Sequence, residues 1–110
     1  MNVQDLAAYG ANVEEGLGRC MGNEQFYLRL VDTVREDATF DALAEALGDG
    51  RLSDAFEAAH ALKGSLGNLA ITPLYEPVCE LTELLRAETD MDYSGLLATI
   101  QQEREKLCAL

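Results

Sequence analysis

The chain has 110 residues, which is enough for one compact domain and too few for two. Its 20 acidic and 8 basic residues give a formal net charge of −12, and this charge would repel nucleic acid and anionic membrane surfaces. The three cysteines stand far apart and lack C-x-x-C spacing, so they predict neither a disulfide framework nor a zinc site.

Two short helices are predicted at the N-terminus. The first covers residues 3–9 and is ended by Gly10. Asn12 is a candidate N-cap of the second helix, and Glu15 follows three residues later, as in a capping box. Leu17 would point inward from this helix, which we expect to end just before Asn23.

Two longer helices are predicted next, over residues 23–36 and 39–48. Asn23 and Thr39 are their candidate N-caps, and glycines close the second helix. Apolar residues recur at helical spacing and form one stripe on each helix. The stripes contain Phe26, Tyr27, Leu30, Val31 and Val34 in the first helix and Phe40, Leu43, Ala44 and Leu47 in the second.

Three further helices complete the chain, over residues 52–69, 72–87 and 93–108. Thr72 and Pro73 are predicted as N-cap and first residue of the middle one, where Pro77 would produce a local kink. Each helix again has an apolar stripe. The stripes contain Leu52, Ala55, Phe56, Ala59, Leu62, Leu66 and Leu69; then Leu74, Val78, Leu81 and Leu85; and finally Leu96, Leu97, Ile100 and Leu107.

This pattern predicts an all-α fold in a single domain, residues 1–110. Amphipathic helices joined by short loops pack most simply as an antiparallel, up-down four-helix bundle. We expect the helices over 23–36 and 39–48 to form one arm and the last three helices to form the others. The short N-terminal helices would cap one end of the bundle.

The stretch AAHALKGSLGNLAI, residues 58–71, contains the only histidine of the chain. At about 100° per residue, His60 lies on the flank of the apolar face, and Gly64 and Gly67 fall on the same side. Lys63 stands one turn after the histidine, so its ammonium can turn toward the imidazole. Glycine costs a helix interior about 1 kcal/mol relative to alanine. The glycines therefore favour a strip of bare backbone that a partner approaches, with close packing against a neighbouring helix as the alternative.

The chemistry that suits this set of residues is phosphoryl transfer. A neutral imidazole is a good nucleophile near pH 7, because its ordinary pKa is about 6.5. A phosphoryl group on the ring would carry close to two negative charges, which Lys63 would offset. On spacing alone, an ordinary polar surface histidine remains the alternative interpretation of His60.

The same stretch resembles the core motif of the histidine-containing phosphotransfer (HPt) domain, roughly H-x-L-K-G-S/A-x-x-x-L/I-G. The matching residues are His60, Leu62, Lys63, Gly64, Ser65 and Leu69. The resemblance extends from about residue 10 to residue 87. The family's usual glycine after Leu69 is Ala70 here, so we expect a slightly different exit from the helix.

The resemblance implies a phosphoryl carrier of a phosphorelay rather than an enzyme with an active site for ATP. His60 would accept phosphoryl from the aspartyl phosphate of a receiver domain, or from a hybrid sensor histidine kinase, and pass it to a response-regulator receiver. Lys63 would offset the phosphate charge, and Gly64 would give the receiver access. No cofactor or metal is implied for the chain itself, because the receiver supplies Mg²⁺ and most of the catalytic groups.

Three more residues are candidate binding residues of this site. Ser65 belongs to the motif, and Gly67 is included for its helical spacing. Thr82 stands, by count from His60, where the family often has Glu or Gln near the second ring nitrogen. Thr82 has a shorter reach than either, so Glu83 or a water is the alternative partner of that nitrogen.

Several alternatives compete with the phosphoryl carrier. Glu57-x-x-His60 has the E-x-x-H spacing of di-iron bundles, but such a site needs two of these motifs and the chain has one histidine. A module that docks a receiver without accepting phosphate, and the phospho-acceptor domain of a larger sensor kinase, both remain open. We favour a free-standing protein and expect a monomer as the simplest state. The chain has neither a signal-peptide pattern nor a run of 18 apolar residues, and we expect it in the cytoplasm.

Overall fold

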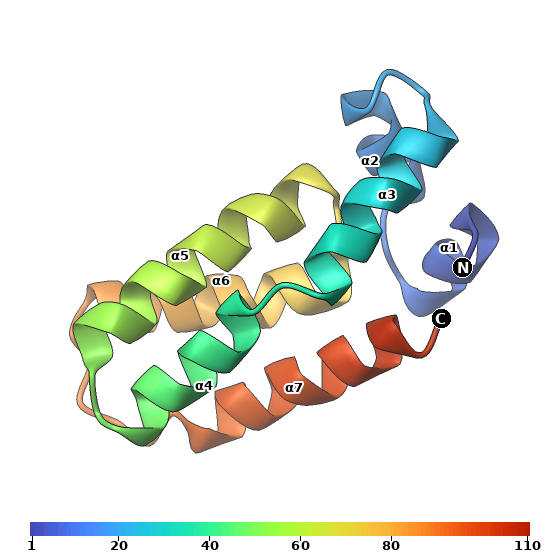
Figure 1. The fold of residues 1–110 in the computed structure, drawn as a ribbon. Coiled ribbons are helices and arrows are strands. Elements are labelled where there is room, and N and C mark those ends of the chain that lie inside the picture. The colour runs from blue at the N-terminus through green and yellow to red at the C-terminus, as the bar shows by residue number, and fades with distance from the viewer.

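The computed structural model describes all 110 residues and is entirely helical, as predicted (Figure 1). Its seven helices are α1 (Val3–Tyr9), α2 (Val13–Arg19), α3 (Glu24–Arg35), α4 (Thr39–Gly48), α5 (Leu52–Asn68), α6 (Thr72–Arg86) and α7 (Ser94–Cys108). Each predicted helix is present, with ends that differ by a few residues at most. None of the seven combines the length and apolar character that a membrane span requires.

The last four helices form the bundle. In Figure 1, α4 to α7 lie side by side, with α5 packed against both α4 and α6, and α6 packed against α7. Helix α3 precedes α4 along the same long axis, so the two form one arm as expected. Helices α1 and α2 lie at the end of the bundle to which α3 leads. The molecule is elongated, with extents of 41 × 23 × 19 Å.

One continuous apolar core of 22 buried residues joins the helices. Helices α5 and α6 supply its centre through Ala55, Ala59, Leu62 and Leu66, and through Leu74, Val78, Leu81 and Leu85. Two predicted stripe residues are wrong, because Phe26 and Leu52 are 43% and 39% exposed. Leu52 is the first residue of α5, and Phe26 stands in the first turn of α3 next to Tyr27, which takes the fully buried position there. Leu17, Ala44 and Leu47 are half-buried at its edge.

Two of the predicted helix caps are confirmed and two are wrong. The side-chain oxygens of Asn12 and Asn23 each accept the backbone N–H three residues later, as an N-cap does. Thr39 is instead the first helical residue, and its N–H donates to the carboxylate of Asp37 at 2.9 Å. Thr72 is likewise the first residue of α6 rather than its cap, so Pro73 is the second helical residue. The hydroxyl of Thr72 donates to the carbonyl of Ala70.

The turn between α5 and α6 contains a residue in the left-handed backbone conformation that glycine usually adopts. Ala70 has φ +54°, and the N–H of Ile71 donates to the carbonyl of Leu66 at 3.0 Å. This bond belongs to the Schellman motif, whose left-handed residue is usually glycine. The expected change in helix exit is therefore wrong: Ala70 adopts the conformation that a glycine would take, and its Cβ makes that conformation strained.

Replacing Ala70 with glycine should stabilise the protein. Ala70→Gly relieves the left-handed strain and raises the free energy of unfolding by about 0.5–1 kcal/mol, after the entropy cost of glycine. Ala87→Gly is the matched control, because Ala87 is exposed and has φ −77°. Chemical denaturation should show stabilisation in the first variant and destabilisation in the second. Equal destabilisation of both would contradict the strain at Ala70.

Candidate functional site

The only histidine of the chain lies near the middle of α5 and points away from the core. His60 is exposed, whereas Ala59 and Leu62 on the same helix are buried. Its ring stacks on the ring of Phe56 one turn earlier, with centroids 5.7 Å apart and planes inclined by 25°. A stacked aromatic neighbour limits the orientations of the imidazole while leaving its edge open to solvent.

Lys63 is held by a carboxylate on the neighbouring helix. Its Nζ lies 3.4 Å from Oε1 of Glu83, and the other oxygen of Glu83 accepts from Nε of Arg86 at 3.3 Å. Partial desolvation would raise the pKa of Glu83, but the charges of Arg86 and Lys63 and their hydrogen bonds hold it below its ordinary value. Glu83 is therefore ionised at neutral pH and shared between the two cations.

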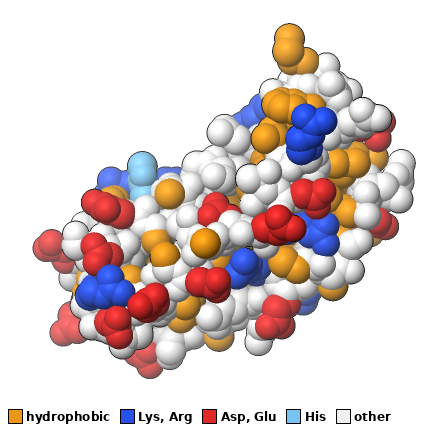
Figure 2. Space-filling view, in the orientation of Figure 1, with side chains coloured by type: hydrophobic (Ala, Val, Ile, Leu, Met, Phe, Trp, Pro, Cys, Tyr) orange, Lys and Arg blue, Asp and Glu red, His pale blue; other side chains and the backbone are white.

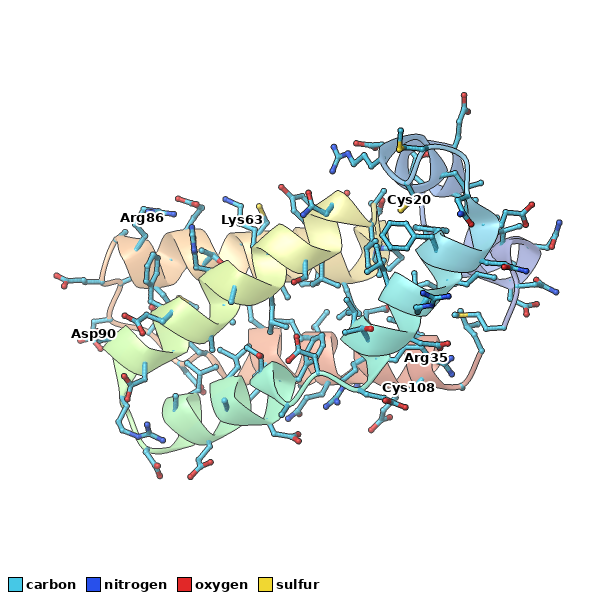
Figure 3. All side chains as sticks on the ribbon, turned by 45° about the horizontal axis from the view of Figure 1, so that its top comes forward. Cys20, Arg35, Lys63, Arg86, Asp90 and Cys108 are labelled. Carbon is cyan, nitrogen blue, oxygen red and sulfur yellow. The ribbon has the colours of Figure 1, made fainter.

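Arg86 also packs over the aromatic ring of Phe56. Its guanidinium carbon lies 5.1 Å from the centroid of Phe56, the residue on which His60 stacks. Figure 3 shows Lys63 and Arg86 on the same edge of the bundle, one from α5 and the other from α6. Phe56 is therefore contacted both by the imidazole of His60 and by the guanidinium of Arg86.

The two glycines near His60 have different surroundings. A Cβ built on Gly64 would have no neighbour within 4 Å, so this part of α5 is bare backbone facing solvent. A Cβ on Gly67 would lie only 2.9 Å from Cε1 of Tyr75 on α6. The interpretation of Gly64 as an open approach agrees with this geometry. For Gly67 the contact with Tyr75 agrees with the alternative interpretation, close packing against a neighbouring helix, and Gly67 also lines the hollow that contains His60.

A shallow hollow of about 270 Å³ runs along this side of α5. Its lining contains Arg19, His60, Lys63, Gly64, Gly67, Asn68 and Tyr75. Arg19 comes from α2, where it pairs with Glu15 at 2.7 Å and donates to the carbonyl of Gly67. Sequence periodicity identified neither Arg19 nor Tyr75, because only the packing of α2 and α6 brings them to the histidine.

Two cations line this hollow on an otherwise acidic molecule. They are Arg19 and Lys63, two of the eight lysines and arginines of the chain, while Arg86 lies outside the hollow and contacts Phe56. In Figure 2 the histidine projects from the surface with basic side chains beside it, while acidic side chains cover much of the same face. This arrangement favours the approach of an anionic group to His60.

The family model for the Hpt domain matches residues 25–109, which is most of the chain. The protein belongs to the Hpt-domain family. No curated protein and no solved structure matches the chain significantly. The sequence resemblance extended from about residue 10 to residue 87. The match to the family model begins later, inside α3, and continues further, through α7. Helices α1 and α2 therefore lie outside the part that matches the family model.

Thr82 does not occupy the position predicted for it in the Hpt domain. It is fully buried, and its hydroxyl donates to the carbonyl of Val78 at 2.7 Å, one turn earlier on α6. The core-facing stripe of α6 includes this residue, so it points away from the surface that carries His60. The assignment of Thr82 to the second ring nitrogen is wrong. Glu83, the alternative, does lie on the His60 side, bonded to Lys63.

Ser65 also points away from the histidine of the Hpt domain. Its hydroxyl donates to the carbonyl of Ala61 at 3.4 Å, and it lines a separate depression together with Leu30 and Val34 of α3. At about 100° per residue, five residues place Ser65 some 140° around α5 from His60. The structure therefore brings together His60, Lys63 and the two glycines, and leaves Ser65 and Thr82 outside the site.

The two glycines make a direct prediction about stability. Gly64→Ala should raise the free energy of unfolding by about 0.5–1 kcal/mol, because alanine favours a helix and meets no neighbour there. Gly67→Ala should gain less or lose stability, because its methyl group must displace the ring of Tyr75. Urea denaturation of both variants measures the difference. A loss of stability in Gly64→Ala would contradict the open strip.

Proposed function

We propose that this protein carries a phosphoryl group on His60 in a phosphorelay. It accepts the group from the aspartyl phosphate of a receiver domain, or from a hybrid sensor kinase, and passes it to the receiver of a response regulator. Membership of the Hpt family supports phosphotransfer in two-component signalling generally. The observation that carries the specific assignment is an exposed, sole histidine flanked by cations and by bare helix backbone.

The transfer needs only an accessible nucleophile on this chain. The lone pair of one imidazole nitrogen attacks phosphorus in line, the bond from phosphorus to the aspartyl oxygen breaks, and the carboxylate leaves with that electron pair. The proton stays on the other ring nitrogen. Stacking on Phe56 supports this step by restricting the ring. On this proposal, the partner receiver supplies the Mg²⁺ that neutralises the charge of the transferred group.

Lys63 would act after the phosphoryl group arrives. In the unmodified protein its ammonium is paired with Glu83, which also binds Arg86. A phosphoryl group on His60 brings close to two negative charges and three acceptor oxygens. This dianion competes with Glu83 for Lys63, so the lysine stabilises the phosphorylated state more than the unmodified state. The docked partner excludes water and strengthens the interaction.

Gly64 would provide room for the partner. It stands one turn after His60, and a Cβ built on it would meet no other part of the protein within 4 Å. A receiver that brings its aspartyl phosphate to the imidazole must place its own loops over this turn of α5. On this proposal the protein works as a monomer in the cytoplasm, and its three free cysteines suit a reducing compartment.

Phosphotransfer to the wild-type protein and to two variants tests the proposal. Incubation with phosphorylated receiver domains and Mg²⁺ should give acid-labile phosphate on the wild type and none on His60→Gln. The fold of this variant should be intact, because His60 is exposed. If several receivers leave no label on the wild type, the protein is a docking module instead. Label remaining on His60→Gln would move the site to another residue.

The contribution of Lys63 can be separated from a general charge effect. Lys63→Ala should slow transfer about fivefold, the factor that corresponds to an ion pair of about 1 kcal/mol. Lys106→Ala is the matched control, because Lys106 is the only other lysine and pairs with Glu103 on α7. Rapid-quench measurement should show normal transfer in the control. Equal slowing in both variants would assign the effect to net charge alone.

A further inference from the structure

Arg19 reaches the site from a part of the chain that precedes the family match. It is the last residue of α2, whereas the match to the Hpt model begins at residue 25. Its side chain lines the same hollow as His60 and Lys63. Figure 3 shows the edge that carries Lys63 and Arg86, with α2 beyond the far end of α5. An element outside the matched region thus adds a cation to the site.

The position of α2 is set by packing in the interior. Gly16 lies against the ring of Tyr27, and a Cβ on this glycine would approach Cε1 of the ring to 2.5 Å. The hydroxyl of Tyr27, a fully buried residue of α3, donates to the carbonyl of Leu69 at 2.9 Å. The N–H of Asn12 donates to the carbonyl of Ala70 at 2.9 Å. These contacts fasten α2 to the C-terminal end of α5 and hold Arg19 beside the hollow.

Arg19 retains hydrogen-bonding capacity toward solvent. One terminal nitrogen donates to the carbonyl of Gly67 and the other donates to Glu15, so two of the five N–H groups of the guanidinium are used. The side chain is 47% exposed, as is that of Glu15. Three donors therefore remain available to a partner molecule, which would share the permanent positive charge of Arg19 with Glu15.

Distance along the helix indicates which part of a partner Arg19 would meet. Gly67, to which Arg19 is bonded, follows His60 by seven residues, or about 10 Å at 1.5 Å per residue. The His60 ring stacks on Phe56, on its N-terminal side and away from Gly67. Arg19 is therefore placed to contact the docked protein at the rim of the interface rather than the transferred phosphoryl group.

We propose that Arg19 is a partner-recognition residue, whose guanidinium binds an acidic group of the receiver domain that docks over His60. The proposal rests on the proposed function, which supplies the receiver as the partner. Charge supports it: Arg19 and Lys63 line one hollow on a chain of net charge −12, so an acidic group of a docked protein is attracted to this hollow and repelled by most of the remaining surface. Helix α2 then contributes to the choice among receivers.

A purely structural role for Arg19 is the competing explanation. A guanidinium bonded to a carbonyl in the last turn of α5 also stabilises that helix end. The two roles predict different effects for the neighbouring carboxylate. If Arg19 acts only as a structural link, Glu15→Gln weakens the link and leaves receiver binding unchanged. If Arg19 binds the partner, Glu15→Gln removes a competing negative charge and strengthens receiver binding.

The experiment measures receiver affinity, phosphotransfer kcat/KM and thermal stability for four variants of the full chain. Arg19→Gln removes the charge and Arg19→Lys preserves it, while Glu15→Gln removes the competitor. Arg51→Gln is the matched control, because Arg51 is 46% exposed, pairs with Asp49 and Asp54, and does not line the hollow. The probe is a receiver domain that binds the wild-type protein, and its transfer of label is measured separately; binding is measured at several salt concentrations.

The proposal predicts a specific pattern. Arg19→Gln should weaken receiver binding and lower kcat/KM about threefold to fivefold, mainly through KM, with a shallower salt dependence. Arg19→Lys should recover most of this loss, Glu15→Gln should improve binding about twofold, and Arg51→Gln should behave as the wild type.

Two results would overturn the role of Arg19. One is a loss of thermal stability in Arg19→Gln with unchanged receiver binding and kcat/KM. The other is an equal loss of binding in Arg51→Gln. Failure of the proposed function looks different, because the wild type would then bind receivers without acquiring label. In that case, weaker binding of Arg19→Gln would still support recognition by Arg19, and unchanged binding would reject it.

Discussion

The packing of α5 against α4 on one side and α6 on the other determines what the remaining surface of α5 can present. Small and branched residues, Ala55, Ala59, Leu62 and Leu66, occupy its buried face. Truncating a leucine in such a stripe costs about 2–5 kcal/mol, so the rotation of α5 about its axis is strongly fixed. With that rotation fixed, His60 must project outward, because its position lies about 100° from Ala59.

The surroundings of His60 depend mainly on α6, which packs beside α5. Helix α6 places Glu83 and Arg86 next to Lys63 and Phe56, so the imidazole has an aromatic support and a set of charges without being enclosed. An enclosed nucleophile would be inaccessible to a partner protein. The open arrangement instead suits chemistry completed by a second molecule, in which this chain contributes position and charge.

Residues close together in sequence were predictable, and residues assembled by packing were not. Helical spacing alone places His60, Lys63 and Gly64 on one side of α5, because a helix has the same geometry everywhere. Thr82 was misplaced because it was assigned by count from His60, although it stands four residues after Val78 and so falls on the predicted apolar stripe of α6. Arg19 was missed because its position depends on how α2 packs against α3, and no local pattern encodes that contact.

The caps and turns were predictable only where one residue decides the local structure. Asn12 and Asn23 cap their helices through their own side chains, whereas the start of α4 depends on Asp37, two residues before Thr39.

The central claim, that the protein is a phosphoryl carrier, is tested most directly by a two-stage transfer. Phosphorylated protein, freed of its donor, should pass its label to a fresh receiver with Mg²⁺. Retention of the label on the protein, with none on the receiver, would contradict the account.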